Sequence, residues 1–201
     1  MDERLAERLR LGLDRAARSG AAAAKVSYGC TESVDCRYEA GRLKSVTTGQ
    51  RIYYTVEVLR DGRRGVAFGN ELAALGAMVE RALALARVGS AAHFDAYPTP
   101  APTTAVRTYD EQTAAWPLEA MVEASGRLAA GLKAHDPAMY AVTGGSRRTG
   151  DGLLVTSGGV RHSTRSTQWS LWAGAQRTDG TDMLFAEYGR GWGRLSEHFD
   201  P

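Results

Sequence analysis

A hairpin pattern decides the fold class, and it lies at residues 51–70, which read RIYYTVEVLRDGRRGVAFGN. From Tyr54 to Val58 every second residue is apolar, which is the period of a strand with one buried face. Asp61-Gly62 is a dipeptide that tight two-residue hairpins favour, and Gly65 to Phe68 continues as the return strand. Strands that are joined by a short turn pair antiparallel, so the sequence predicts an antiparallel sheet.

Helices and further strands flank this hairpin. Asp2 to Ser19 places leucine and alanine residues on one stripe of a charged surface, which predicts a helix. Val34 to Glu39 alternates like a strand, and a second strand at Leu43 to Thr48 follows a turn. Asn70 is expected to cap a second helix that runs to about Arg87, because its side chain can accept from free amides of the first turn.

The second half of the chain repeats this order of helix and strands. Proline alternates between Tyr97 and Thr104, so this stretch is predicted to be a linker or an edge-lying extended segment. A third helix is expected from Trp116-Pro117 to His135, because proline is favoured at the first helical position. Strand segments separated by polar or glycine-containing stretches follow at Tyr140–Val142, Leu153–Thr156, Thr167–Ala175 and Met183–Tyr188.

These elements predict an α+β fold of two helix-plus-antiparallel-meander units, with sheets covered by helices. The 201 residues fit one large domain or two small ones. We expect an amino-terminal α+β domain at residues 1–96, a proline-rich linker at 97–114 and a second α+β unit at 115–201.

Composition and charge exclude several classes of protein. Hydrophobic residues make up 43% and charged residues 24%, which argues against disordered, collagen-like and coiled-coil chains. The 25 lysines and arginines nearly balance 23 acidic residues, so nucleic acid is not expected as a partner. Charges throughout residues 1–20 exclude a secretory signal there, and no uncharged stretch is long enough to span a bilayer. We therefore expect a cytoplasmic protein without a membrane partner.

The motifs assign no catalytic, cofactor-binding or metal-binding residue. A zinc hydrolase typically carries two histidines one helical turn apart, whereas the four histidines here are far apart in the sequence: His93, His135, His162 and His198. Ser157-Gly158-Gly159 lacks the spacing of a nucleophile elbow and is predicted to be a turn. Thr143 to Arg148 lacks the G-K-[ST] ending of a P-loop. Two cysteines, Cys30 and Cys36, are too few for a disulfide framework.

Tryptophans gather in the last third of the chain. Trp169 and Trp172 are an odd number of residues apart, so on a strand they face opposite sides of the sheet. One of them can be part of the core, and the other is a candidate for an interface or a binding surface. Because large aromatic side chains mostly serve burial, core and subunit packing are favoured over ligand binding.

An ordered series of patches resembles the TldD/PmbA family. The patches are Gly41–Val46, Arg51–Val58, Arg60–Asn70, Val79–Arg87, Thr156–Val160, Arg165–Thr167 and Asp179-Gly180. The resemblance implies a metallopeptidase, or a metallopeptidase-like partner, that processes unfolded or leader peptides; the family was once described as modulators of DNA gyrase. Its catalytic members hold zinc through an H-E-x-x-x-H helix in their carboxy-terminal half. That motif is missing from this sequence, so no zinc ligand or catalytic residue is carried over.

Three functions remain open at this point. The resemblance favours the scaffold, dimer surface and peptide-chamber wall of a TldD/PmbA-type peptidase, inactive alone and ending before the metal-bearing half. Its partner is expected to be a second copy or a paralogous subunit, with unfolded peptide as a further partner. The alternative is a standalone module that binds extended peptide along a sheet edge. Nucleic-acid association, suggested by the arginine excess and the older family name, ranks last.

Overall fold

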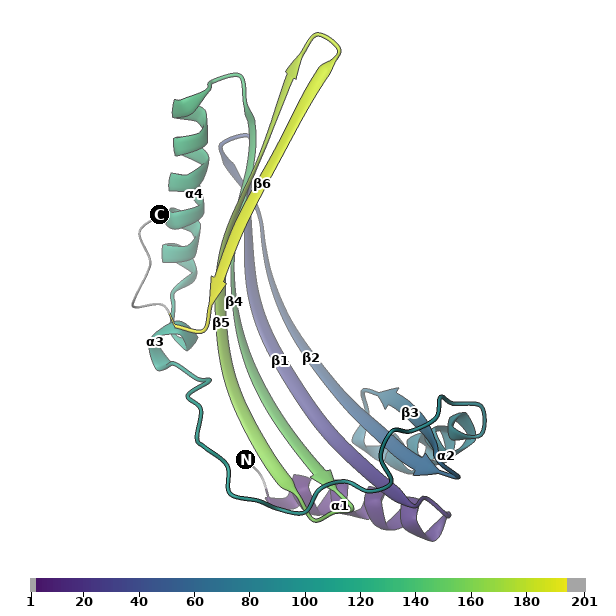
Figure 1. Cartoon of the computed structure of the whole chain (residues 1–201). Coiled ribbons are helices and arrows are strands. Elements are labelled where there is room, and N and C mark those ends of the chain that lie inside the picture. Colours follow the sequence, from purple (N-terminus) through teal and green to yellow (C-terminus); the bar gives the residue numbers. More distant parts are fainter. Residues whose placement is uncertain (1–2, 195–201) are drawn as a thin grey trace. The chain divides into compact units, whose positions relative to one another are not determined.

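The computed structural model describes residues 3–194 of the chain and confirms the α+β class (Figure 1). Its elements, in chain order, are α1 (Glu3–Arg18), β1 (Ala23–Glu39), β2 (Arg42–Arg60), β3 (Arg63–Gly69), a 3-10 turn η1 (Leu72–Ala74), α2 (Leu75–Ala86), α3 (Glu111–Ala114), α4 (Leu118–His135), β4 (Tyr140–Thr156), β5 (Arg161–Asp179) and β6 (Asp182–Trp192).

Within residues 3–194 the two meanders join into one six-stranded sheet with the order β3-β2-β1-β4-β5-β6. The first meander ends in the predicted hairpin, where Arg60 pairs with Arg63 across the turn. Asp61 and Gly62 both have positive φ angles, 52° and 69°, as a two-residue turn of this hand requires. Strands β1 and β4 are neighbours in the middle of the sheet, so their pairing connects the two meanders.

Contacts divide the chain into two compact units, each made of three segments. Unit 1 contains Met1–Cys30, Arg51–Val106 and Asp151–Thr164, and unit 2 contains Thr31–Gln50, Arg107–Gly150 and Arg165–Pro201. The regions expected from the sequence, 1–96, 97–114 and 115–201, follow chain order instead. The difference arises because β1, β2, β4 and β5 are 17 to 19 residues long, so a single strand contributes to both units.

The strands are longer than the sequence pattern predicts. The expected strand at Leu43–Thr48 and the alternating stretch Tyr54–Val58 are parts of one strand, β2. Likewise β4 runs without a break through the polar stretch Thr143–Arg148, which separates two of the expected segments. Both strands have a neighbour on each side, and backbone hydrogen bonds to those neighbours hold polar residues and glycines in extended conformation.

Two of the predicted helices match the structure closely. Within the described residues, α1 buries one stripe, Ala6, Leu9, Gly12 and Ala16, and keeps its charged side chains exposed. Helix α4 begins at Leu118, directly after Pro117, and ends at His135.

The start of the second helix and the extent of the linker are corrected. Asn70 does not cap α2, because a 3-10 turn comes first and α2 begins after Ala74, which has no capping side chain. The expected linker 97–114 contains the short helix α3, because the carboxylate of Asp110 accepts a hydrogen bond from the amide of Thr113 and caps its first turn.

Each unit has its own hydrophobic core. In unit 1, α1 and α2 pack against the strands, and the largest fully buried side chains there are Leu9, Met78, Leu153, Val26, Val56, Val58 and Val79. In unit 2, Met121 and Ala124 of α4 pack with Cys36 and Trp169, and Figure 1 shows α4 running alongside the strands of this unit. The ring of Trp169 stacks on Trp192 at 4.6 Å between centroids.

No helix within residues 3–194 is long and apolar enough to cross a membrane.

The strand β4 depends on glycine where Trp172 of β5 covers it. A Cβ at Gly144 would lie 2.6 Å from the Trp172 indole nitrogen and 2.7 Å from the carbonyl oxygen of Cys36. We predict that Gly144→Ala lowers the free energy of unfolding by about 1–3 kcal/mol, because the crowded backbone must shift. Chemical denaturation measures the loss.

A glycine in α4 provides the matched control. A Cβ at Gly131 would meet nothing within 4 Å, so Gly131→Ala should leave stability unchanged or raise it by up to about 1 kcal/mol. Equal effects of the two substitutions would show that Trp172 does not press against Gly144.

Candidate functional site

A pocket of about 510 Å³ lies within unit 2, on strands of the second meander and on β1. Its lining residues are Arg37 from β1; Tyr140 and Val142 from β4; Trp172, Gly174, Ala175 and Gln176 from β5; and Phe185, Ala186 and Glu187 from β6. Four strands thus contribute to one concave surface, and most of its walls are apolar or aromatic.

The pocket lies on the sheet face opposite to α4. Trp169 is 1% exposed and belongs to the core under α4, whereas Trp172 is half-buried and lines the pocket. The odd spacing of these two residues is what places them on opposite faces of β5. This confirms the sequence-based prediction that one of them is core and the other lies on a surface.

A glycine creates the space at the centre of the pocket. In the β5–β6 register, Gly174 pairs with Glu187, and its flanking pairs are Trp172 with Gly189 and Gln176 with Phe185. Paired residues share a face of the sheet, so Glu187 has no side chain directly opposite on β5. A Cβ at Gly174 would make only ordinary contacts, the nearest at 3.7 Å. The centre of the pocket is therefore open because Gly174 has no side chain to occupy it.

Charged groups lie at two sides of the pocket. On the β1 side, the Arg37 guanidinium lies 5.8 Å from the centre of the Trp172 ring, and its Nε lies 3.9 Å from a carboxylate oxygen of Glu39. The Tyr140 hydroxyl donates to Glu39, and this hydrogen bond lowers the pKa of Glu39 below its ordinary value. On the β6 side, the exposed carboxylate of Glu187 has no hydrogen-bond or ion-pair partner among residues 3–194.

A second polar cluster, in unit 1, surrounds the buried carboxylate of Glu57. Lys25 Nζ lies 3.0 Å away, Arg64 donates at 2.8 Å, and the hydroxyl of Tyr97 donates at 2.8 Å. Burial acts to raise the pKa of Glu57, but the hydrogen bonds from these three side chains outweigh it and hold the pKa at about 2. Because every donor is engaged with this carboxylate, the cluster is a structural anchor for the segment that begins at Tyr97.

We predict that Glu57→Gln lowers the free energy of unfolding at pH 7 by about 1–3 kcal/mol, since Lys25 and Arg64 lose their anionic partner but remain partly solvated. The folded-state pKa lies below the ordinary value of 4.5. The stabilisation is therefore complete above that value and is lost as pH falls towards 2. Denaturation of both proteins across this window checks the difference.

An exposed ion pair gives the control for this substitution. Glu80 pairs with Arg15 at the surface, so Glu80→Gln should change stability by no more than about 0.5 kcal/mol. Two results would refute the anchoring role of Glu57. One is a loss of stability for Glu57→Gln as small as that for Glu80→Gln. The other is a fall in the stability of Glu57→Gln at low pH that is as steep as in the unsubstituted chain.

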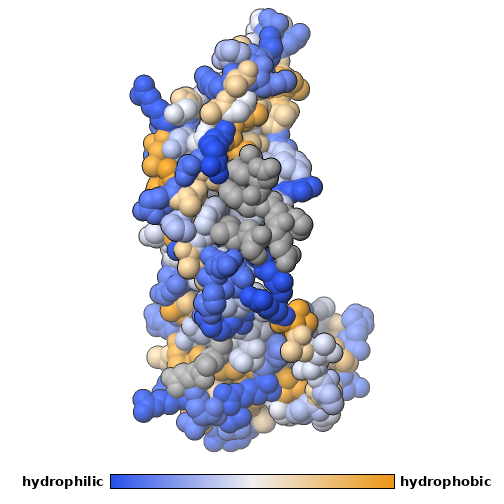
Figure 2. Space-filling view, turned by 90° about the vertical axis from the view of Figure 1, so that its left-hand side faces the viewer, coloured by the Kyte–Doolittle hydropathy of each residue, from blue (hydrophilic) through white to orange (hydrophobic). Residues whose placement is uncertain are grey.

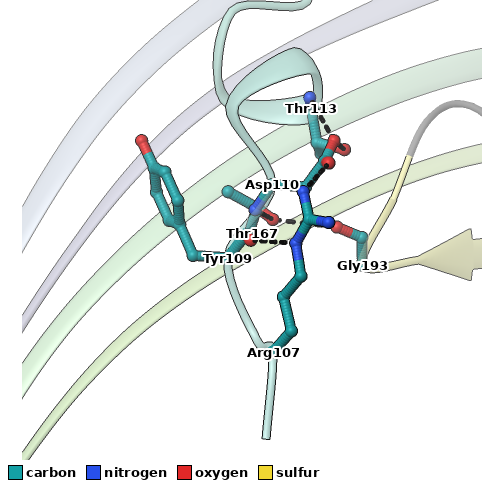
Figure 3. Close-up of polar contacts among 6 residues, drawn as sticks. All are labelled: Arg107, Tyr109, Asp110, Thr113, Thr167 and Gly193. Carbon is teal, nitrogen blue, oxygen red and sulfur yellow. Dashed lines mark hydrogen bonds and ion pairs between the residues drawn. The ribbon is translucent and has the colours of Figure 1, made fainter.

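A third cluster centres on Asp110 and is drawn in Figure 3. Its carboxylate accepts from the amide and the hydroxyl of Thr113, at 2.9 and 2.8 Å, and pairs with Arg107 at 3.2 Å. The hydroxyl of Thr167 on β5 accepts from the Asp110 amide and donates to the carbonyl of Gly193. This chain of bonds attaches the segment before α3 to β5 and to the residue just after β6.

These contacts identify Asp110 as structural, and the hydrogen bonds from Thr113 lower its pKa. We predict that Asp110→Ala lowers the melting temperature more than Asp110→Asn does, because asparagine retains an oxygen that can cap α3. Thermal unfolding of the three proteins tests this. Equal melting temperatures for the two variants would contradict the capping role.

The residues considered from sequence lie in different parts of the described structure. Ser157 lies in the turn between β4 and β5, where its hydroxyl accepts from the Ala24 amide at 3.0 Å. His93 lies in the loop after α2, His135 at the end of α4 and His162 on β5; all three are exposed, while His198 lies outside the described residues. Within residues 3–194, no group of three or more His, Cys, Asp or Glu side chains could hold a metal ion. The described residues therefore do not fit a zinc centre, and no chemical step is assigned to one.

A known protein family matches the part of the chain that contains the first meander and α2. Residues 22–86 match the model described as PmbA/TldA metallopeptidase domain 1. This stretch of the chain is therefore similar to the first domain of the TldD/PmbA family. The match covers β1, β2, β3 and α2, which include the hairpin at residues 51–70. No match was found among the curated proteins.

Solved structures share the fold of nearly the whole chain. TldE from Thermococcus kodakarensis is 12% identical with a TM-score of 0.75, and 96% of this chain covers 43% of that one. A candidate modulator of a DNA gyrase from Thermotoga maritima is 15% identical (TM-score 0.76), with 97% and 45% covered. Another, from Bacteroides thetaiotaomicron, is 17% identical (TM-score 0.79), with 94% and 45% covered. The chain thus spans less than half the length of these structures.

Proposed function

We propose that this chain is a non-catalytic, peptide-holding portion of a TldD/PmbA-type metallopeptidase. The observation that carries the proposal is the position of β6. This strand is at the end of the sheet order, and its residues Asp182–Gly191 are exposed. An edge strand offers one row of unpaired backbone groups, and an extended peptide can pair with them as an additional strand.

The pocket supports this assignment because it adjoins the same strand. Phe185, Ala186 and Glu187 of β6 line it, so a peptide paired along β6 places alternate side chains on the face where the pocket opens. Backbone pairing supplies affinity for any unfolded sequence, while a pocket beside the edge can discriminate among side chains.

We further propose that the exposed apolar residues of β6 contact a second subunit, either another copy or a paralogous family member. Met183, Leu184 and Tyr188, which do not line the pocket, are all more than half exposed. At the upper end of Figure 2, where the β5–β6 hairpin lies, hydrophobic residues lie beside hydrophilic ones. Apolar side chains grouped on one exposed strand are typical of a surface that contacts a protein or a peptide.

Calorimetric titration tests the peptide-holding role. An unfolded peptide of about ten residues should bind with a dissociation constant in the micromolar range and should remain uncleaved after prolonged incubation. The matched control is the same peptide with alternate backbone amides methylated, which removes the donors that strand pairing needs.

Binding of the unmodified peptide, with at least tenfold weaker binding of the methylated one, is the expected result. The absence of heat at millimolar peptide, or equal binding of the two peptides, would contradict the proposal. Cleavage of the peptide by the purified chain would contradict its non-catalytic character.

A further inference from the structure

We propose that the pocket between β1 and β6 binds the side chain of a lysine or arginine residue of the held peptide. This inference rests on the proposed function and adds a preference to it. It depends on three features of the pocket: a carboxylate without a partner, aromatic walls and a floor that lacks a side chain.

The carboxylate is that of Glu187. Its cross-strand neighbour on β5 is Gly174, which has no side chain that could donate a hydrogen bond or carry a positive charge. Among residues 3–194 no hydrogen bond or ion pair engages it. A peptide that pairs along the outer edge of β6 places a residue directly opposite Glu187 on the same face, and opposite charges in such a pair attract.

The aromatic walls suit the long stem and the charged head of a basic side chain. Trp172, Tyr140 and Phe185 line the pocket, and aromatic ring faces attract cations as well as alkyl chains. The same wall already holds one cation, because the guanidinium of Arg37 lies over the ring of Trp172.

The charges of the pocket favour a positive occupant. Arg37 is the one cationic side chain among the lining residues, and Glu39 balances it at 3.9 Å. Arg177, which follows Gln176 on the opposite face of β5, is paired with Asp136 at the end of α4. The negative charge of Glu187 is therefore not balanced by a lining residue. A lysine or arginine of the peptide would pair with this carboxylate, whereas an acidic residue would be repelled by it.

The shape of the floor decides how far the side chain enters. Gly174 leaves an opening between Trp172 and Gln176, and a Cβ atom placed there would meet no atom closer than 3.7 Å. A valine at this position would therefore narrow the centre of the pocket, and valine is well suited to a strand, which gives a second, independent way to obstruct the site.

The experiment uses peptides of one unfolded host sequence that differ at a single central residue, lysine, arginine, glutamine or glutamate, and titrates each into the full chain. We expect the lysine and arginine peptides to bind about five- to tenfold more tightly than the glutamine peptide, and the glutamate peptide to bind most weakly. The preference for lysine and arginine should decrease as the salt concentration is raised, because the ion pair with Glu187 is partly exposed to solvent.

Two variants test the assignment to the pocket. Glu187→Gln and Gly174→Val should each abolish the preference for basic residues, so that each variant binds the lysine and arginine peptides no more tightly than it binds the glutamine peptide. The matched control is Glu71→Gln, an exposed carboxylate in unit 1, which should keep the preference intact.

Each result separates the two proposals. If every peptide binds equally well, or if the preference survives Glu187→Gln, the lysine or arginine site is refuted while peptide holding stands. If no peptide binds the unsubstituted chain, the peptide-holding function itself fails. Circular dichroism of both variants shows whether the sheet is retained, so that a loss of fold is not counted as a loss of preference.

Discussion

The pairing of β1 with β4 is the interaction on which the rest of the structure depends. Each meander is only three strands wide, and β1 and β4 are the two strands that connect them in the sheet order. The pocket needs this junction, because Arg37 of β1 lies across β4 from Trp172 and Glu187. Val142 of β4 lines the pocket between them, and Gly144 on the same strand leaves room for Trp172.

Local sequence signals predicted much of the fold. Asp61-Gly62 identified the hairpin, Pro117 marked the start of α4, and the spacing of Trp169 and Trp172 placed one side chain in the core and one at the pocket. These features depend on neighbouring residues alone. The joined sheet and the interleaved units depend on pairing between strands more than a hundred residues apart, for which a single sequence carries no local signal.

The polar clusters were missed for a related reason. Glu57 alternates with valines and therefore resembles a residue on the solvated face of a strand, but Tyr97, forty residues later, covers it. Asp110 followed by Thr113 is a capping signal that could have revealed α3, although the prolines before it favoured a linker. Gly174 gave no signal, because its importance comes from its pairing with Glu187.

An exposed edge strand, a pocket beside it and the similarity of residues 22–86 to a PmbA/TldA metallopeptidase domain together support the proposed role, the holding of extended peptide. Amide hydrogen exchange with and without a saturating unfolded peptide tests this role most directly, because it reports which backbone groups become bonded. The account predicts slower exchange in residues 182–192, with little change at β3, the opposite edge. Unchanged exchange in β6, with protection at β3 or in the helices, would contradict it.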